Sequence, residues 1–411
     1  MTSVGVADNP ALVGGGPTVR PTLPRWPPVD DGQRAGLLRV LDSGEWWSRG
    51  GAAVATFERD FAAAHGARHG IACTNGTHAL ELALRCLDIG PGDEVIVPAM
   101  TFAATGMAVM LVGARPIPVD VDPASWCIDV DQVARALSPA TRAVIPVHFA
   151  GRLAAMPALC ALAAEAGIAV VEDAAHAHGA RRDGRPAGSY GDFAAFSFQN
   201  FKLMTAGEGG MLLANDAALA ATARTVAHCG RPPGDGGYRH THLGSNMRMS
   251  EFQAAVLQAQ LERLEERARL REDRALRLRD RLRGINGLRL QEAGAGRHAC
   301  YMLVAQLDEQ GLDGLSRDEF VAALVAEGVP AFRMYPSIAS LEHFAGDFAR
   351  LGGDPAALPP TPVSDALGER GLWLHHRILL GDAGLVDEVG DAVAKVIAGA
   401  DRLRAFFDAR R

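Results

Sequence analysis

Residues 193–214 read FAAFSFQNFKLMTAGEGGMLLA. The runs Phe193–Phe198 and Met211–Ala214 are short and apolar, as buried strands are, and a glycine-rich turn lies between them. Lys202 therefore follows the end of a strand, and strand ends in α/β sheets are where ligands bind.

Similar apolar runs recur through the N-terminal half of the chain. They alternate with alanine-rich helical patterns, which is typical of a largely parallel sheet covered by helices on both faces. Besides the two runs above, we expect strands at Glu94–Pro98, Pro116–Val121, Ala143–Val147 and Ile168–Glu172.

The pattern divides the chain into four parts. Residues 1–30 are rich in Gly and Pro and predict an irregular arm that can wrap a neighbouring subunit. Residues 31–250 carry the large sheet. Residues 251–285 predict one long amphipathic connecting helix, because no Gly or Pro interrupts the pattern up to Arg283. Residues 286–411 predict a smaller α/β domain, with a strand at Tyr301–Leu307 and helices at Arg317–Glu327 and Leu385–Ala398.

Composition excludes several classes of protein. The chain is 48% hydrophobic and 22% charged with a net charge of -7, as soluble globular proteins are. It has no dense basic block, which argues against nucleic acid as a partner, and its apolar runs are too short to span a membrane. The 6 cysteines form no Cys-x-x-Cys pair, so we expect reduced, buried thiols, no metal site and a cytoplasmic location.

Lysine is nearly absent from the sequence. Of the 41 Lys and Arg residues only Lys202 and Lys395 are lysines. Arginine can replace lysine as a surface charge, but it stays protonated and cannot act as an amine nucleophile. Lys395 lies in the last amphipathic helix, where an exposed lysine is expected. Lys202 is therefore the candidate for amine chemistry.

Other candidates accompany Lys202. Asp173 ends the strand Ile168–Glu172, so an acid and an amine can meet at one edge of the sheet. Pyridoxal phosphate needs a lysine to form a Schiff base and a carboxylate to keep its ring nitrogen protonated. Gly76 and Thr77 begin a helix whose free N–H groups suit a phosphate, and Ser197 adds a hydroxyl.

Each of these signals has a structural alternative. Asp173 can be a helix cap, and Gly76 with Thr77 can be an ordinary turn. His176 and His178 can be a metal pair, although this stretch supplies too few ligands for one.

Taken in order, the motifs resemble the DegT-type sugar and cyclitol aminotransferases over roughly residues 30–400. The resemblance implies a fold-type I transferase that uses pyridoxal 5'-phosphate and works as a homodimer with active sites at the subunit interface. It is carried by residues 74–77, 97–102, 119–122, 146–148, 172–176, 197–210 and 244–251.

The resemblance also implies roles for single residues. Lys202 is then the Schiff-base lysine and the proton carrier, and Asp173 is the partner of the ring nitrogen. The other implied cofactor contacts are His176 against the ring, Phe102 as an aromatic contact, Gly76, Thr77 and Ser197 at the phosphate, and Asn246 at the phosphate of the neighbouring subunit.

The residues of these motifs are especially similar to those of 3-amino-5-hydroxybenzoate synthases and of aminotransferases that act on keto-inositols and other cyclitols. This implies transfer of an amino group from glutamine or glutamate to a cyclic polyhydroxy ketone, in the biosynthesis of an aminocyclitol or antibiotic-type metabolite. Two alternatives are an aromatising dehydration of an aminoshikimate-type ring and a non-catalytic sensor on the same fold.

Phe201 stands where the synthases are expected to have a smaller residue, and a bulky side chain beside Lys202 can reshape the pocket.

Several aromatic and hydrogen-bonding side chains are candidates for contact with the substrate, because such side chains suit a polyol. Core packing or dimer contact is the alternative role for each of them. The candidate substrate contacts are Trp46, Trp47, Arg49, Tyr335, His375 and Arg377.

Overall fold

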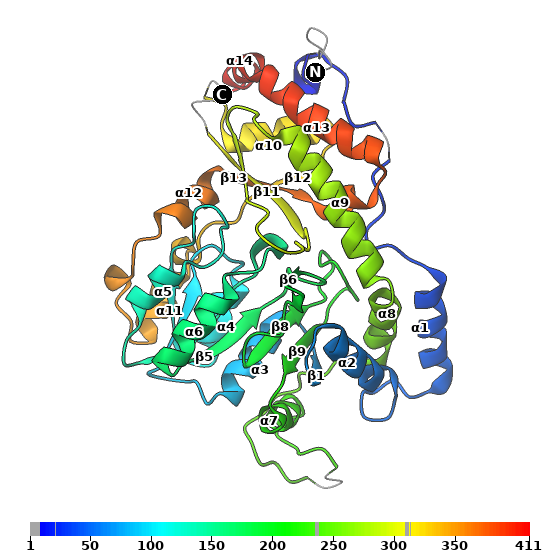
Figure 1. Ribbon diagram of the computed structural model, residues 1–411, viewed down its shortest axis with the longest axis vertical. Coiled ribbons are helices and arrows are strands. Elements are labelled where there is room, and N and C mark those ends of the chain that lie inside the picture. Colours follow the sequence, from blue (N-terminus) through cyan, green and yellow to red (C-terminus); the bar gives the residue numbers. More distant parts are fainter. Residues whose placement is uncertain (1–8, 21, 235–237, 309–311, 313) are drawn as a thin grey trace.

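The computed structural model describes residues 9–20, 22–234, 238–308, 312 and 314–411. A large α/β part, built on a seven-stranded sheet, lies below a smaller part built on a four-stranded sheet, and one long helix runs between them (Figure 1). The expected fold class is confirmed. The domain boundaries at residues 30, 250 and 285 stay a prediction.

The large sheet has the strand order β1-β9-β8-β5-β4-β2-β3. Strand β9 runs antiparallel to both of its neighbours, and the other pairs are parallel, so the sheet is mostly parallel as expected. The strands are β1 (His69–Cys73), β2 (Glu94–Pro98), β3 (Arg115–Val119), β4 (Thr141–Val144), β5 (Ala169–Asp173), β8 (Phe193–Ser197) and β9 (Gly210–Ala214).

Helices cover both faces of this sheet. Along β8, Ala194 and Phe196 face one apolar core while Phe193 and Ala195 face the other, because successive side chains of a strand point to opposite sides. The helices of this part are α1 (Asp31–Ser43), α2 (Ala53–Ala64), α3 (Gly76–Cys86), α4 (Ala104–Leu111), α5 (Val130–Ala136), α6 (Met156–Ala166) and α7 (Ala217–Ala227), with a small hairpin of β6 (Arg181–Arg182) and β7 (Arg185–Pro186).

The prediction of a single connecting helix over residues 251–285 is wrong. The structure has two helices, α8 (Glu251–Leu261) and α9 (Leu264–Leu282), with Glu262 and Arg263 between them. Helix α8 packs against α1 and α2 of the large part, whereas α9 packs against α13 of the small part. The break therefore follows from packing against two different surfaces, and no Gly or Pro marks it in the sequence.

The small part is an antiparallel sheet of order β10-β11-β13-β12 with helices against it. Helix α14, which follows α13 directly, was not expected from the sequence. Its elements are β10 (Leu288–Leu290), β11 (Met302–Leu307), β12 (Ala331–Arg333), β13 (Gly371–His375), α10 (Arg317–Ala326), α13 (Ala383–Ala398) and α14 (Ala400–Asp408). Helix α12 (Pro362–Arg370) contacts both parts, and α11 (Phe344–Arg350) packs on the large part, where Phe344 and Phe348 join its core. Short 3-10 turns lie at Ala11–Val13, Phe149–Gly151, Ile338–Ser340, Pro355–Ala357 and His376–Leu380.

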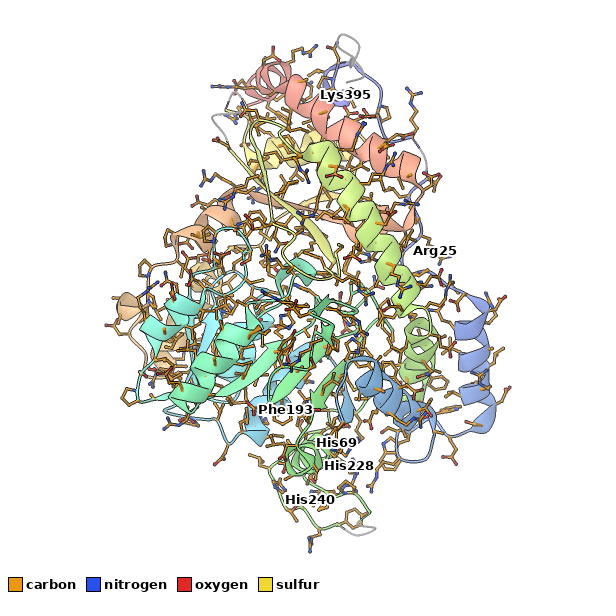
Figure 2. The ribbon with its side chains drawn as sticks, viewed as in Figure 1. Arg25, His69, Phe193, His228, His240 and Lys395 are labelled. Atoms are coloured by element: carbon orange, nitrogen blue, oxygen red, sulfur yellow. The ribbon has the colours of Figure 1, made fainter. Side chains whose placement is uncertain are left out.

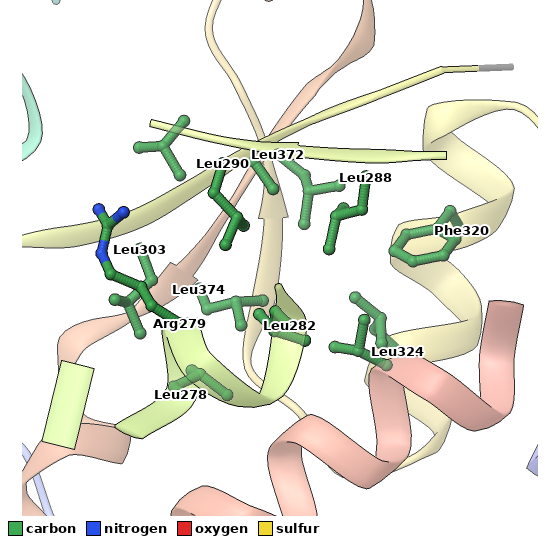
Figure 3. Close-up of a pocket in the computed structure, with 13 residues that line it drawn as sticks. Leu278, Arg279, Leu282, Leu288, Leu290, Leu303, Phe320, Leu324, Leu372 and Leu374 are labelled. Carbon is green, nitrogen blue, oxygen red and sulfur yellow. The ribbon is translucent and has the colours of Figure 1, made fainter. Parts of the chain in front are cut away.

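A small cavity lies in the core of this part. Leucines of α9 and of the sheet line it together with Phe320 and Leu324 of α10 (Figure 3). Its volume of about 30 Å³ is close to the volume of a single water molecule. It is a packing gap and is too small to hold a substrate.

The described part of the N-terminal arm packs on its own chain. The carboxylate of Glu327, whose side chain is fully buried, accepts hydrogen bonds from Ala11 N (2.8 Å), Thr18 N (2.8 Å) and Thr18 Oγ1 (2.7 Å). Val19 adds its side chain to the core of the small part. The arm is thus a strap on its own subunit. That it also wraps a neighbouring subunit stays a prediction.

Lys395 is not the exposed lysine that the sequence predicts. Its side chain is 14% exposed, and its Nζ donates to Gly16 O at 2.7 Å and to Glu327 Oε2 at 3.1 Å. Lys395 therefore neutralises Glu327 and holds the arm. A compact ammonium with several donors suits this place between a carbonyl and a carboxylate.

The six cysteines are free thiols. Cys73, Cys127 and Cys300 are buried as expected, whereas Cys86, Cys160 and Cys229 are partly exposed. Burial raises the pKa of the Cys300 thiol to about 12, which makes it unreactive. In the part of the chain that the structure describes, we find no helix with the length and apolarity that a membrane crossing requires.

Glu327→Gln is expected to loosen the arm. Burial opposes ionisation of Glu327, but the donors from Ala11, Thr18 and Lys395 outweigh it and hold its pKa below the usual value. The loss of charge-assisted hydrogen bonds should lower the free energy of unfolding by about 2 kcal/mol at pH 7. Urea denaturation followed by tryptophan fluorescence measures this difference.

The effect has a defined pH dependence. Because the folded pKa of Glu327 is depressed, its stabilisation is present above about pH 4.5, the ordinary glutamate value, and is lost as the pH falls through the folded pKa. The difference from wild type should shrink over that range. Glu369→Gln, at an exposed position of α12, is the control, and an equal loss of stability in that variant would contradict the assignment.

Candidate active site

The carboxyl ends of the central strands face the small part. Phe193 and His69, which begin β8 and β1, lie at the far edge of the sheet (Figure 2), so both strands run toward the small part. Asp173 ends β5 and Ser197 ends the adjacent strand β8. The fold therefore brings the candidate acid and the segment that bears Lys202 to one edge, as the sequence predicts.

Lys202 lies in the loop that follows β8 and faces an aromatic wall. Its Nζ is 4.5 Å from the ring centroid of Tyr301, in a cation–π contact. Tyr301 comes just before β11 of the small part and stacks on His176 of the large part, with centroids 4.3 Å apart and an interplanar angle of 20°. Residues from both parts of the molecule thus fix the surroundings of the lysine amine.

Asp173 is a buried carboxylate with few partners. Its Oδ2 accepts a hydrogen bond from Thr105 Oγ1 (2.8 Å), and its Oδ1 accepts one from Ala175 N (3.1 Å). Burial raises the pKa of the Asp173 carboxyl, while these donors and the charge of Lys202 oppose the rise. A cation or an N–H placed beside this carboxylate would stabilise its ionised form.

Two further buried polar groups have no hydrogen-bond partner among the described residues, one close to Lys202 and the other close to Asp173. They are Nδ1 of His176 and the hydroxyl of Tyr335. Burial and the charge of Lys202 lower the pKa of His176 well below its ordinary value, so its ring is neutral. Tyr335 makes edge contacts with Phe102 and Phe149, each at 6.2 Å between centroids. Such orphaned groups indicate where a ligand supplies the missing partners.

The start of α3 forms a cradle for an anion. Asn75 caps this helix and accepts from His78 N at 2.8 Å. The first N–H groups of a helix, here those of Gly76 and Thr77, have no acceptor within the helix and favour negative charge. A Cβ on Gly76 would lie 2.7 Å from Ser197 Cβ, so only glycine lets the helix approach the Ser197 hydroxyl this closely.

The candidate substrate contacts fall into two groups. Tyr335 lies beside the site, and His375 contacts Phe201, the neighbour of Lys202, with centroids 5.6 Å apart. The backbone N of Arg377 donates to His375 Nδ1 at 3.1 Å. His375 therefore touches the loop that carries Lys202, Arg377 is linked to that loop through His375, and Tyr335 lies on the side of Asp173.

The other group gathers around His228, far from Lys395 in Figure 2. Arg49 Nη1 lies 2.6 Å from His228 Nε2, and the ring of Trp47 packs 6.0 Å from the imidazole. Asn246 pairs with His228 through an isolated backbone bridge, and Trp46 and Trp47 are half exposed. We call Trp46, Trp47, Arg49, His228 and Asn246 the His228 cluster.

No ring contact, hydrogen bond or ion pair links the His228 cluster to Lys202 or Asp173 within the part of the chain that the structure describes. Arg248 adjoins the cluster: its Nη1 lies 2.8 Å from His228 Nδ1, and its guanidinium lies 5.6 Å from the Trp47 ring centroid. Cationic neighbours and burial lower the pKa of His228 to about 4.

Sequence reasoning missed Tyr301 and Thr105. Tyr301 comes just before a strand and Thr105 is the second residue of a helix, so each looks like an ordinary core position. Only the fold brings Tyr301 to Lys202 and Thr105 to Asp173. No local motif identifies either residue.

The residues present fit pyridoxal phosphate. The donor set of α3 and Ser197 matches a phosphate, and the buried Asp173 matches a protonated ring nitrogen. The orphaned Nδ1 of His176 and hydroxyl of Tyr335 are buried polar groups that a bound ligand would satisfy. Lys202 is one of the two amines of the chain that a cofactor aldehyde can use.

Comparisons with known proteins agree with this fit. The DegT/DnrJ/EryC1/StrS aminotransferase family matches residues 29–394. The 3-amino-5-hydroxybenzoate synthase of Amycolatopsis mediterranei is 43% identical, over 92% of this chain and 98% of that protein. The L-glutamine:2-deoxy-scyllo-inosose aminotransferase of Streptoalloteichus tenebrarius is 37% identical, over 96% of this chain and 99% of that protein.

A crystal structure of 3-amino-5-hydroxybenzoic acid synthase superimposes with a TM-score of 0.86 and 42% identity, over 92% of this chain and 99% of that chain. The family match covers most of the chain, and its cofactor is the one that the site fits. The chain therefore belongs to the DegT/DnrJ/EryC1/StrS aminotransferase family and is an aminotransferase that uses pyridoxal 5'-phosphate.

Proposed function

We propose that the protein transfers an amino group from glutamine or glutamate to a cyclic polyhydroxy ketone, either a keto-cyclitol or a ketosugar. The product would serve the biosynthesis of an aminocyclitol or antibiotic-type metabolite. The observation that carries this proposal is the Lys202 amine, which lies against the Tyr301 ring and close enough to the buried Asp173 to affect its pKa. The similarity to glutamine:inosose aminotransferases supports glutamine as the amino donor and a cyclitol ring as the acceptor.

In this proposal the chain's own residues bind and orient the cofactor. Gly76, Thr77 and Ser197 hold the phosphate at the start of α3, and Asp173 holds the protonated ring nitrogen. The flat, neutral ring of His176 lies against the cofactor, and Phe102 adds an aromatic contact. When bound, pyridoxal phosphate supplies an aldehyde that accepts amino groups and a ring that withdraws electrons.

Lys202 moves the proton. With the cofactor bound, its amine would carry a proton between the amino-bearing carbon of the substrate and the carbon of the cofactor's aldehyde group, in opposite directions for the donor and for the ketone. One general acid–base thus serves both halves of the reaction. Arginine cannot do this, because its guanidinium stays protonated. This accounts for a true lysine at position 202 in a chain that otherwise uses arginine.

Substrate recognition is assigned to Tyr335, His375 and Arg377 around the Lys202 loop. The buried Tyr335 hydroxyl has no partner among the described residues and suits a hydroxyl of the substrate ring. Burial and Arg377 lower the pKa of His375 to about 4, so it can donate or accept a hydrogen bond as a neutral imidazole.

The protein would act as a cytoplasmic homodimer with shared sites. The His228 cluster is separate from Lys202 of its own chain, and its tryptophans are half exposed. We assign Trp46, Trp47, Arg49 and Asn246 to the active site of the neighbouring subunit, where Asn246 reaches the phosphate. Free cysteines fit a reducing cytoplasm.

A second candidate is the 3-amino-5-hydroxybenzoate synthase reaction, in which an aminated, shikimate-like ring loses water and becomes aromatic. The identity of 43% to such a synthase favours it. Lys202 would again remove the proton, so the two candidates differ in the substrate and not in the base.

Lys202→Arg should abolish turnover while the fold is retained. Removal of the general acid–base should lower kcat by about 1,000-fold or more. Borohydride reduction of the cofactor-loaded wild type followed by peptide mapping should find the cofactor on Lys202. Lys395→Arg is the matched control, because it makes the same change at the other lysine and should keep its activity. Turnover by Lys202→Arg would refute the assignment.

Mixed dimers test whether the sites are shared. Lys202→Arg and Asn246→Ala should each have low activity alone. After the two are dissociated and reassociated together, random pairing gives half heterodimers with one intact site each, so about a quarter of wild-type activity should return. A mixture of Lys202→Arg with Asp173→Asn is the control and should recover nothing, because both changes damage the site of their own subunit. Failure of the first mixture to recover would contradict shared sites.

The two candidate reactions differ in the donor step. With excess glutamine or glutamate, an aminotransferase should convert its cofactor to the amine form, which changes the absorbance spectrum. Keto-inositols, valienone-type ketones and nucleotide ketosugars, added one at a time, should then restore the first spectrum where they are substrates. A spectrum unchanged by either donor, together with aromatisation of an aminoshikimate-type ring, would favour the synthase reaction.

A further inference from the structure

Two side chains remote in sequence hold the peptide groups that immediately precede Lys202. The indole Nε1 of Trp26 donates to the carbonyl of Asn200 at 2.6 Å. The imidazole Nε2 of His376 lies 2.9 Å from the carbonyl of Phe201. Two consecutive carbonyls of the lysine loop are thus bound from outside the loop, one by the N-terminal arm and one by the small part.

The two rings also contact each other. Their centroids are 4.4 Å apart at an interplanar angle of 90°, an edge-to-face arrangement. Because a carbonyl only accepts hydrogen bonds, His376 donates from Nε2, which leaves Nδ1 without a hydrogen in the neutral ring. Burial and Arg271 lower the pKa of His376 well below its ordinary value, so this single tautomer persists at neutral pH.

Arg271 of α9 faces the indole of Trp26. Its guanidinium carbon is 5.8 Å from the ring centroid, and the residue is 1% exposed. Among the described residues, Nε and Nη2 of Arg271 have no hydrogen-bond acceptor. Burial lowers the pKa of Arg271 to about 9, so the group is still charged at neutral pH and gains from a π face in a desolvated place.

The arm is anchored on both sides of Trp26. Before it, Glu327 and Lys395 hold Ala11, Gly16 and Thr18. After it, Asp30 caps α1 in a reciprocal pair of hydrogen bonds with Gln33. Arg25, the residue before Trp26, lies where the arm passes the lower end of α9 (Figure 2). Trp26 is therefore held between two fixed points of the chain.

We propose that Trp26 and His376 are positioning residues that clamp the 200–202 segment and thereby fix where the amine of Lys202 lies. This rests on the proposed role of Lys202. The amine must reach two different carbons, and a misplacement of about 1 Å can cost about 100-fold in rate. The clamp makes that position depend on the arm and on the small part. The small part also touches Lys202 directly, through Tyr301.

The test removes one hydrogen bond at a time. Trp26→Phe keeps an aromatic ring without the N–H, and His376→Leu removes the imidazole donor. His376→Gln is the rescue variant, because its terminal amide can donate from nearly the same position. The matched control is Trp373→Phe, which also loses an indole N–H bonded to a backbone carbonyl, that of Arg333 at 3.1 Å in the small part.

Each of Trp26→Phe and His376→Leu should lower kcat about fivefold to tenfold, as the loss of one net hydrogen bond predicts, with little change in KM for the donor. Proton transfer should become more rate-limiting, so the kinetic isotope effect with a donor deuterated at its α carbon should increase. The double variant should lose less than the product of the two single losses, because the two residues act on one loop. His376→Gln should recover most of the rate.

Wild-type kcat and isotope effect in folded Trp26→Phe and His376→Leu would overturn the proposal. If even the wild type does not transaminate, the proposed function fails, and hydrogen–deuterium exchange of the 199–203 peptide decides on the clamp alone. Exchange faster in Trp26→Phe than in both wild type and Trp373→Phe supports it, and equal exchange in all three overturns it.

Discussion

The buried carboxylate of Asp173 is the constraint on which the site depends. A charge removed from water is costly unless partners compensate it, and here Thr105, the Ala175 N–H and the nearby Lys202 do so only in part. Asp173 is buried because it ends β5, a central strand whose carboxyl end lies beneath the small part. In the proposed function, the same burial that costs stability would strengthen the binding of a cationic ring nitrogen by Asp173.

The amine opposite this carboxylate is held by parts of the chain that meet only in the folded state. Tyr301 precedes a strand of the small sheet, His376 follows another, and Trp26 belongs to the arm. Each of them contacts Lys202 or the two residues before it. The break between α8 and α9 contributes to these contacts. It lets α8 pack on the large part while α9 places Arg271 against the indole of Trp26.

The strands and the ends of strands could be predicted from the sequence, because a buried strand is marked by its own residues. The inner strands lie within three residues of their expected bounds, and Asp173 and Ser197 end β5 and β8. Strand β1 was not expected, since its five residues include a glycine and a histidine and form no clear apolar run. Tyr301, Thr105 and Trp26 were missed for a different reason. Their roles arise from contacts over long sequence distances, which leave no local pattern.

The two lysines show what composition can and cannot reveal. Their rarity draws attention to both positions, and both are found in specific contacts. Rarity alone did not separate their roles, because Lys395 was expected on the surface and instead neutralises the buried Glu327. The ammonium of Lys395 holds the arm, the arm holds Trp26, and Trp26 binds the loop of Lys202. The two lysines are therefore linked by a single segment, and under the proposed clamp the N-terminal arm contributes to the site together with the strand ends.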